Sequence, residues 1–230
     1  MARPLRNAQQ VDLQAAIKET AWQQIAESGA SSLSLRSIAR ALGITAPAIY
    51  NYFPRRDDLV TAMIIDAYTS FGDVLIAARD AILTDDRPGR LIAIGIAYRQ
   101  WALDYPQRYH LIFGTPIPGY VAPMEKVQPF AARALGVLVS VVETLRQAGE
   151  LNSHGFPKMG AEFEPDFENW KNHVGKVNAL SRSVAVLIWC QVHGLVSLEI
   201  AGSLQPFGVN GDSLYFYQLN QINKQFIIQK

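Results

Sequence analysis

The side chains best suited to acid–base or metal chemistry are few and scattered along the chain. There are four histidines and one cysteine, and no histidine stands at a metal-ligand spacing from another. The short signatures of phosphate-binding loops, zinc peptidases and paired redox cysteines do not occur, so we predict no metal site and no cofactor. One hypothesis is an enzyme that uses His193 and Cys190 as acid and nucleophile. Their helical spacing of three does not by itself bring the two side chains together.

A second kind of chemistry is indicated by polar side chains within residues 34–56. Phenolic hydroxyls and guanidinium groups suit phosphate oxygens. An asparagine amide can pair with an adenine edge, and an alanine or a proline can contact a thymine methyl group. For Tyr50 the alternative is packing against the helix predicted over residues 11–29. The candidates for contact with double-stranded DNA are Arg36, Thr45, Ala46, Pro47, Tyr50, Asn51, Tyr52 and Arg56.

Two short helices joined by a tight turn would position these side chains. Ser34 can cap the first helix, and Gly43 follows where a helix ends in a left-handed residue. Thr45 can cap the second helix, whose first turn tolerates Pro47 because the missing N–H costs nothing there. Ile49 then closes a small core. The pattern predicts a helix-turn-helix whose second helix suits the DNA major groove.

The same stretch resembles a known family. The N-terminal DNA-binding region of TetR-type transcriptional regulators is similar to the run LSLRSIARALGITAPAIYNYFPRRDDL. Two later segments, DYPQRYHLIFGTPIPGY and WCQVHGLVSLE, resemble the WHG-type C-terminal domain of one branch. The resemblance implies a homodimer that binds a near-palindromic operator and releases it on binding a small molecule.

The resemblance also bears on single positions of the recognition surface. Family members commonly touch DNA at the positions that match Thr45, Ala46, Pro47, Tyr50, Asn51 and Arg56. Many of them have Gly or Lys where this chain has Pro47 and Ala46. We therefore expect apolar contact and DNA shape to carry part of the specificity.

The rest of the chain is also predicted to be helical, which gives an all-α fold of about nine helices. A helix over residues 11–29, with Trp22 in its core face, supplies the third wall of the small N-terminal core. We expect a helix-turn-helix head over residues 1–56 and a larger ligand-binding and dimerisation domain over residues 57–230. Apolar residues at helical spacing predict further helices over residues 57–83, 89–104, 106–113, 124–149, 174–202 and 212–228.

Three local features complete this interpretation. Asp57 is expected to cap the helix that it begins. Residues 2–10 are interpreted as a short arm carrying Arg3 and Arg6, or as a frayed terminus. Residues 150–172 form a polar, irregular connection whose acidic run is expected to be a solvated surface.

Aromatic side chains concentrate in the helices that follow the head. They could line an apolar cavity with a few polar tips, and the resemblance implies such a pocket for a small, largely apolar ligand. The alternative is a solid core, in a DNA-binding regulator or architectural protein that has no effector. The candidates for effector binding are Tyr68, Phe71, Tyr98, Trp101, Tyr109, Phe113, Met124, Trp189 and His193.

The predicted helix over residues 174–202 carries a stripe of small side chains that would let a partner helix approach closely. With the last helix it predicts a homodimer through a four-helix interface. Residues 184–201 are apolar enough to suggest a membrane span, but polar side chains interrupt them. We therefore predict a buried helix instead. The small residues are Cys190, Gly194, Ser197 and Ala201, and the interrupting ones are Gln191, His193 and Glu199.

Composition and charge agree with a DNA-binding head. Hydrophobic residues make up 49% of the chain and charged residues 18%, so a sizeable core is available and a folded chain is expected. Residues 1–56 carry seven Lys or Arg against three Asp or Glu, a net charge of +4, whereas residues 57–230 carry 14 against 17, a net charge of −3. The single cysteine fits a reducing compartment, and no signal peptide is visible, so a cytoplasmic location is expected.

Overall fold

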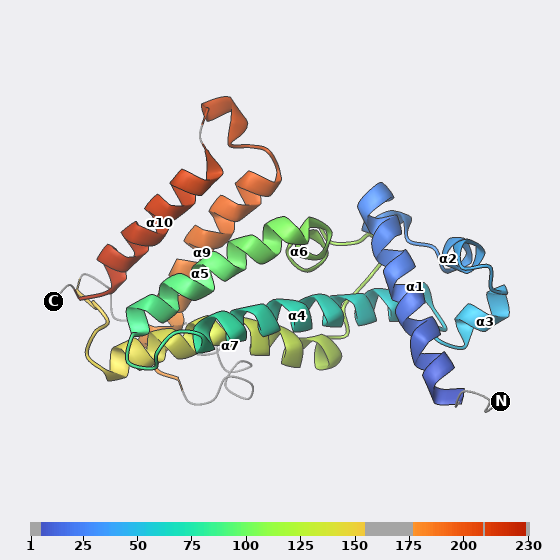
Figure 1. Cartoon of the computed structure of the whole chain (residues 1–230), viewed down its shortest axis with the longest axis horizontal. Coiled ribbons are helices and arrows are strands. Elements are labelled where there is room, and N and C mark those ends of the chain that lie inside the picture. The colour runs from blue at the N-terminus through green and yellow to red at the C-terminus, as the bar shows by residue number, and fades with distance from the viewer. Residues whose placement is uncertain (1–5, 155–176, 209, 229–230) are drawn as a thin grey trace. The chain divides into compact units, whose positions relative to one another are not determined.

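The structure is a computed structural model that describes residues 6–154, 177–208 and 210–228. These residues form helices, and their one β-type pairing is an isolated bridge between Leu151 and Ile227 (Figure 1). The all-α prediction is confirmed. The nine α-helices of the described residues are α1 (Arg6–Ser28), α2 (Leu35–Ala41), α3 (Ala46–Tyr50), α4 (Arg56–Asp80), α5 (Arg87–Asp104), α6 (Pro106–Phe113), α7 (Met124–Gln147), α9 (Ala179–Ile200) and α10 (Gly211–Phe226); the short 3-10 helices are η1 (Ala30–Ser32) and η3 (Gln205–Phe207).

The chain divides into two compact units. The head unit comprises Met1–Ala67 and Gln107–Val127, and the helical unit comprises Tyr68–Pro106 and Gln128–Lys230. Helices α4, α6 and α7 contribute residues to both. The expected domain boundary after Arg56 falls inside the head unit, and it stays a prediction about where DNA binding and ligand binding separate.

The helix-turn-helix of the head unit forms for the local reasons that the sequence indicates. The Ser34 hydroxyl accepts a hydrogen bond from the Ser37 amide at 3.4 Å, which caps α2. Gly43 has a φ of 65°, in the left-handed region where a side chain would be strained. Thr45 is the N-cap of α3, as predicted, although its hydroxyl makes no capping hydrogen bond.

The core of the head unit is apolar and continuous. Ile17 and Ala21 of α1 are fully buried together with Ile38 of α2 and Ile49 of α3. Trp22 is also buried, which confirms its predicted place in the core, and the guanidinium of Arg108 lies 5.3 Å from the centre of its indole ring. These contacts fix α2 against α1, and α3 against α2.

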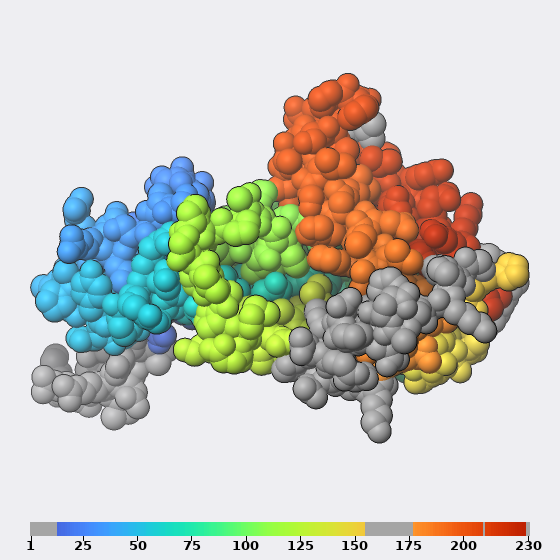
Figure 2. All heavy atoms as spheres, turned by 180° about the vertical axis from the view of Figure 1, so that it is seen from behind, coloured from blue at the N-terminus to red at the C-terminus, as the bar shows by residue number. Residues whose placement is uncertain are grey.

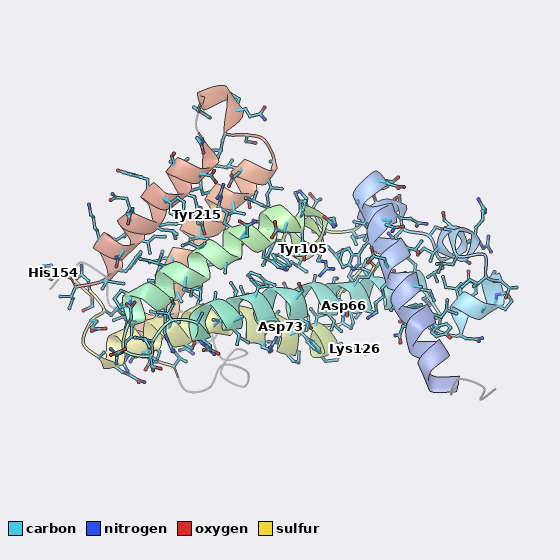
Figure 3. The ribbon with its side chains drawn as sticks, viewed as in Figure 1. Asp66, Asp73, Tyr105, Lys126, His154 and Tyr215 are labelled. Carbon is cyan, nitrogen blue, oxygen red and sulfur yellow. The ribbon has the colours of Figure 1, made fainter. Side chains whose placement is uncertain are left out.

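Aromatic side chains of α4 and α5 form the core of the helical unit. Phe71 packs edge-on against Tyr98, with ring centres 5.3 Å apart, and against Trp101 at 4.8 Å. Burial of the indole leaves its N–H in need of a partner, which is the Ser70 hydroxyl at 3.0 Å. Asp73, which Figure 3 labels on α4, pairs at 2.7 Å with an arginine of α7.

A charge cluster joins α5 to the helical hairpin of α9 and α10. Arg99 of α5 contacts Glu199 of α9 with two nitrogens, at 2.7 and 2.5 Å, and Asp212 of α10 at 2.7 Å. Beside it, the hydroxyl of Tyr215 donates to the backbone carbonyl of Gly95 (Figure 3). A Cβ atom at Gly211 would overlap the Glu199 carboxylate, so a side chain there would displace that carboxylate.

The ends of several helices differ from the sequence prediction. Helix α1 begins at Arg6, so the supposed arm is helical from that residue; residues 1–5 lie outside the described ranges. Asp57 does not cap α4 but lies in its first turn, and the Asp58 carboxylate accepts from the Arg55 amide at 3.0 Å. Helix α9 begins after Asn178, whose side-chain oxygen accepts from the Leu180 amide and stops the helix from extending back. Most of the predicted irregular connection, residues 155–172 with the acidic run, lies outside the described ranges.

Helix α9 is less buried than the sequence suggests. Val186, Leu187 and Leu198 are 43–48% exposed, so the prediction of a buried helix is wrong for one face. In Figure 2 the α9 residues (orange) lie at the surface of the molecule. By length and composition alone α4, α7 and α9 are apolar enough to cross a membrane, and half of the relevant stretch is buried in α4 and α7 but only 28% in α9. An apolar helix face that the described residues leave uncovered indicates contact with another apolar surface.

Glu143 of α7 is a buried carboxylate that ties this helix to α9. It accepts hydrogen bonds from Arg146 at 2.7 and 3.0 Å, from the Ser181 hydroxyl at 2.7 Å and from Gln147 at 2.9 Å. The Arg146 guanidinium contributes most to lowering the pKa of Glu143 from 4.5 to about 2. Because the pKa is lower in the folded chain, the stabilisation is present above pH 4.5 and is lost as the pH falls towards 2.

We predict that Glu143→Gln lowers the free energy of unfolding at pH 7 by about 1 kcal/mol, since Arg146 is partly screened by solvent. The variant should also lose less stability than the wild type between pH 4.5 and 2. Denaturant melts across this pH range measure both effects. Glu125→Gln, at an exposed position of the same helix, is the control and should behave like the wild type. Equal acid sensitivity of Glu143→Gln and the wild type would contradict the role of Glu143.

Candidate nucleic-acid interface and ligand cavity

Helix α3 is held from one side and presents the other to solvent. Ile49 is its buried anchor. The residues on the opposite face, Ala46, Pro47 and Asn51, are exposed, and Tyr50 is 39% exposed. Partial exposure of Tyr50 leaves its ring able to reach beyond the head.

The other predicted DNA contacts flank this face. Thr45 is exposed at the start of α3 and Arg36 is exposed on α2, whereas Tyr52 is half-buried. The structure adds Arg40, one turn after Arg36 on α2 and also exposed. The sequence could have revealed Arg40, because it stands four residues after Arg36 and this spacing places both arginines on one helical face. Their charges lie on the helix that precedes the turn.

The arginines at the start of α4 have partners within the head. Arg55 makes a two-pronged contact with Asp58, at 3.1 and 2.9 Å, which lowers the pKa of that carboxyl group. Arg56 donates from Nε to the carbonyl of Leu33 at 3.1 Å and from Nη2 to the carbonyls of Ala30 and Ser31 at 3.1 and 3.2 Å. These bonds direct the Arg56 guanidinium towards the protein backbone. Contact of Arg56 with phosphate stays a prediction.

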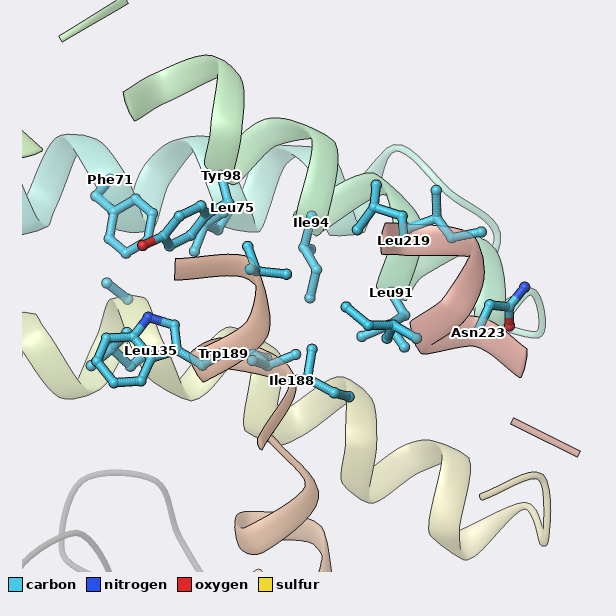
Figure 4. Close-up of a pocket in the computed structure, with 16 residues that line it drawn as sticks. Phe71, Leu75, Leu91, Ile94, Tyr98, Leu135, Ile188, Trp189, Leu219 and Asn223 are labelled. Carbon is cyan, nitrogen blue, oxygen red and sulfur yellow. The ribbon is translucent and has the colours of Figure 1, made fainter. Parts of the chain in front are cut away.

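A cavity of about 50 Å³ lies within the helical unit. A single water needs roughly 10–15 Å³ on the same measure, so there is room for a small molecule. Figure 4 shows Tyr98 and Trp189 on facing walls and Asn223 at the far end. Among the side chains that line the cavity none carries a charge: Phe71, Leu75, Leu91, Ile92, Ile94, Tyr98, Ala134, Leu135, Leu138, Ile188, Trp189, Val192, Leu219, Ile222 and Asn223, together with Gly95.

One wall of the cavity is backed by His193. The Tyr98 hydroxyl and His193 Nδ1 share a hydrogen bond of 2.8 Å, and the Trp189 ring stacks on the imidazole at 4.8 Å. Burial lowers the pKa of His193, so its ring is neutral near pH 7. Cys190, on the same helix, is exposed. The structure thus gives His193 a tyrosine partner rather than Cys190.

The structure brings together only some of the predicted effector residues. Phe71, Tyr98 and Trp189 line the cavity, with His193 behind them. Trp101 is 2% exposed and packs beneath Phe71, and Tyr68 is half-buried on α4. The three remaining candidates belong to the head unit: Tyr109 is buried against Phe113, and Met124 is 57% exposed at the start of α7. Sequence reasoning missed the aliphatic lining residues, because leucines and isoleucines at helical spacing also indicate ordinary core.

Family models match both parts of the chain. The model described as bacterial regulatory proteins of the tetR family matches residues 17–63, which include the helix-turn-helix. The model described as a tetracyclin repressor-like C-terminal domain matches residues 91–221, which include much of the cavity wall.

Known relatives match over most of their length. The HTH-type transcriptional regulator Rv1816 of Mycobacterium tuberculosis is 34% identical over 193 residues, 83% of this chain and 81% of the relative. The crystal structure of regulatory protein SCO4313 has a TM-score of 0.78 at 36% identity, covering 95% of this chain and 98% of that one. A protein of unknown function from Rhodococcus sp. RHA1 shares the fold, with a TM-score of 0.72 at 20% identity and coverage of 94% and 96%. The chain belongs to the TetR family of transcriptional regulators, whose members bind DNA and form dimers.

Proposed function

We propose that the protein is a dimeric cytoplasmic repressor that leaves a near-palindromic operator when a small, uncharged ligand enters the cavity of the helical unit. The observation that carries this proposal is the cavity with no charged lining, in a chain that also has an exposed recognition helix. The ligand must bind the released state more tightly than the operator-bound state, because only a difference in affinity shifts the equilibrium.

The exposed face of α3 supports reading in the major groove. Asn51 can make two hydrogen bonds to an adenine edge, and Ala46 and Pro47 can contact thymine methyl groups. The Tyr50 hydroxyl suits a phosphate oxygen. In a dimer, two such helices would meet half-sites about one DNA turn apart.

Arg36 provides a test of the phosphate-facing side. We predict that Arg36→Ala weakens binding to all DNA sequences and lowers the slope of log affinity against log salt by ~0.9, the value for one phosphate contact. Binding is measured by fluorescence anisotropy over a range of salt concentrations, with a DNA selected by the wild type from a random pool. The control, Arg79→Ala, removes an arginine of the helical unit that pairs with Asp80. An unchanged slope in Arg36→Ala would remove Arg36 from the interface.

The exposed apolar side chains of α9 and α10 support dimerisation through these helices. Val186, Leu187 and Leu198 are exposed on α9, and Phe216 and Tyr217 are 52% and 61% exposed on α10. A Cβ atom placed at Gly194 of α9 would meet nothing within 4 Å. Small residues there allow the close approach of a second α9. The two hairpins would form the four-helix interface that the sequence predicts.

We predict that Leu187→Glu converts a dimer into a monomer at micromolar concentration. Burying a leucine contributes about 1.5–3 kcal/mol, and the glutamate also places a charge in the interface. Light scattering coupled to size-exclusion chromatography measures the mass. Leu83→Glu is the matched control because Leu83 is 76% exposed in the turn before α5 and belongs to neither helix, and it should stay dimeric. A dimeric Leu187→Glu protein, or a monomeric wild type, would reject this interface.

The chemistry of the cavity wall narrows the class of ligand. Moving an ionised group out of water costs several kcal/mol unless an opposite charge compensates for it. The lining has no such charge, and its polar groups are confined to Tyr98, Trp189 and Asn223. A short apolar molecule with at most one or two hydrogen-bonding groups fits this wall best.

We predict that a medium-chain alcohol binds at least ~100-fold more tightly than the carboxylate of equal length. A carboxylic acid would bind in its neutral form, so its apparent affinity should fall tenfold for each pH unit above its own pKa. Tryptophan fluorescence, with Trp189 in the wall, and calorimetry follow binding, and release of the selected DNA follows the functional effect. Leu135→Phe, which adds bulk to the wall, should weaken the alcohol and leave DNA binding unchanged. Equal binding of the alcohol and the carboxylate would overturn the argument from charge.

The alternative function, a DNA-binding regulator without an effector, gives a different result. In that case neither probe would change the fluorescence or release the DNA, and Leu135→Phe would stabilise the protein by filling space. Thermal melts with and without the alcohol distinguish the two, because a ligand that binds only the folded protein raises the melting temperature.

A further inference from the structure

The guanidinium of Arg56 joins two segments of the head unit that are far apart in sequence. Its three hydrogen bonds reach the carbonyls of Ala30, Ser31 and Leu33 at 3.1–3.2 Å, on the turn that includes η1 and leads into α2. We propose that Arg56 is a positioning residue for operator recognition, which fixes α2 and α3 by tying the start of α4 to the turn before α2. The inference rests on the proposed DNA-binding surface of α3.

The helix-turn-helix needs such a tie because its helices are short. Helix α3 has five residues and α2 has seven, and helices of this length are not stable by themselves in water. Arg56 connects the chain just before α2 to the chain just after α3, so the segment between Leu33 and Arg56 is held at both ends. Ile49 fixes its middle. Together these contacts determine the direction in which the exposed face of α3 points.

The geometry requires an arginine in particular. The planar guanidinium presents donors in a fixed fork, and here Nε and Nη2 both donate to the turn while Nη1 lies 3.9 Å from Asp57. A lysine has one compact ammonium group at the end of a flexible stem and cannot reproduce the fork. The Arg56 side chain is 28% exposed, in keeping with a group turned towards the backbone. Arg56→Lys keeps the charge and loses the hydrogen-bonding geometry. It therefore separates a contact with phosphate, which needs the charge, from a positioning role, which needs the fork.

A phosphate contact, a positioning role and a merely structural role predict different results. Loss of a phosphate contact lowers affinity for every DNA and reduces the salt slope, because one fewer counterion is released. Loss of positioning lowers affinity for the selected sequence, while the affinity for random DNA and the salt slope stay the same. A merely structural loss lowers the melting temperature and the fraction of molecules that can bind DNA. It does not change the preference of the folded molecules for the selected sequence over random DNA.

The experiment compares Arg56→Ala, Arg56→Lys and Arg36→Ala with the wild type, all as full-length chains well below their melting temperatures. The probes are a duplex selected by the wild type and a random duplex of equal length, each titrated over a range of salt concentrations. We expect both Arg56 variants to lose about tenfold in the ratio of selected to random affinity, as for one hydrogen bond to a charged group. Their salt slopes should match the wild type. The Arg36→Ala slope should fall by ~0.9.

A stoichiometric titration with DNA, which gives the fraction of molecules that can bind, and amide hydrogen exchange complete the test. The fraction of molecules competent to bind should stay near one, and exchange of the α2 amides should quicken in both Arg56 variants without DNA. The proposal is overturned if Arg56→Lys binds like the wild type, if the Arg56→Ala slope falls as in Arg36→Ala, or if only the fraction of molecules that can bind DNA drops. If the wild type itself shows no preference between the two duplexes, the proposed DNA function fails, and the exchange data still report whether Arg56 holds α2.

Discussion

The burial of Ile49 is the interaction on which the recognition surface depends. Helix α3 is too short to persist alone, so its direction is set by packing against α2 rather than by its own hydrogen bonds. Side chains opposite Ile49 face solvent for the same reason. A core contact of one isoleucine thus decides which residues can meet a base edge, and the backbone contacts of Arg56 act on the same short segment from its ends.

Apolar side chains lie in three different environments in this chain. In the head unit they fill a closed core around Ile17 and Ile38. In the helical unit the aromatic rings of Phe71 and Trp101 pack tightly, whereas neighbouring aliphatic side chains leave an uncharged space. On α9 the apolar face is left uncovered within the described chain. These three surfaces correspond to stability, to ligand binding and to association in the function proposed for the protein.

The sequence specified the head better than the helical unit, for physical reasons. Ser34 and Gly43 act through local backbone geometry, which single residues reveal, so the turn and its helices were predictable. The cavity depends on how well distant side chains fill space, which helical periodicity does not report. Rings were therefore expected to line it from both units, and the aliphatic wall was missed. The small residues of α9 were expected to contact a partner, but the exposure of its large apolar side chains was missed, because an apolar helix gives the same pattern whether its cover comes from its own chain or from elsewhere.

The contact between Gly211 and Glu199 has a consequence for which substitutions the chain can accept at these two positions. Since the carboxylate occupies the space of a Cβ at position 211, any replacement of that glycine requires the Glu199 carboxylate to move. The movement would disturb the ion pair between Glu199 and Arg99. The effect of a substitution at either of positions 199 and 211 therefore depends on the residue at the other.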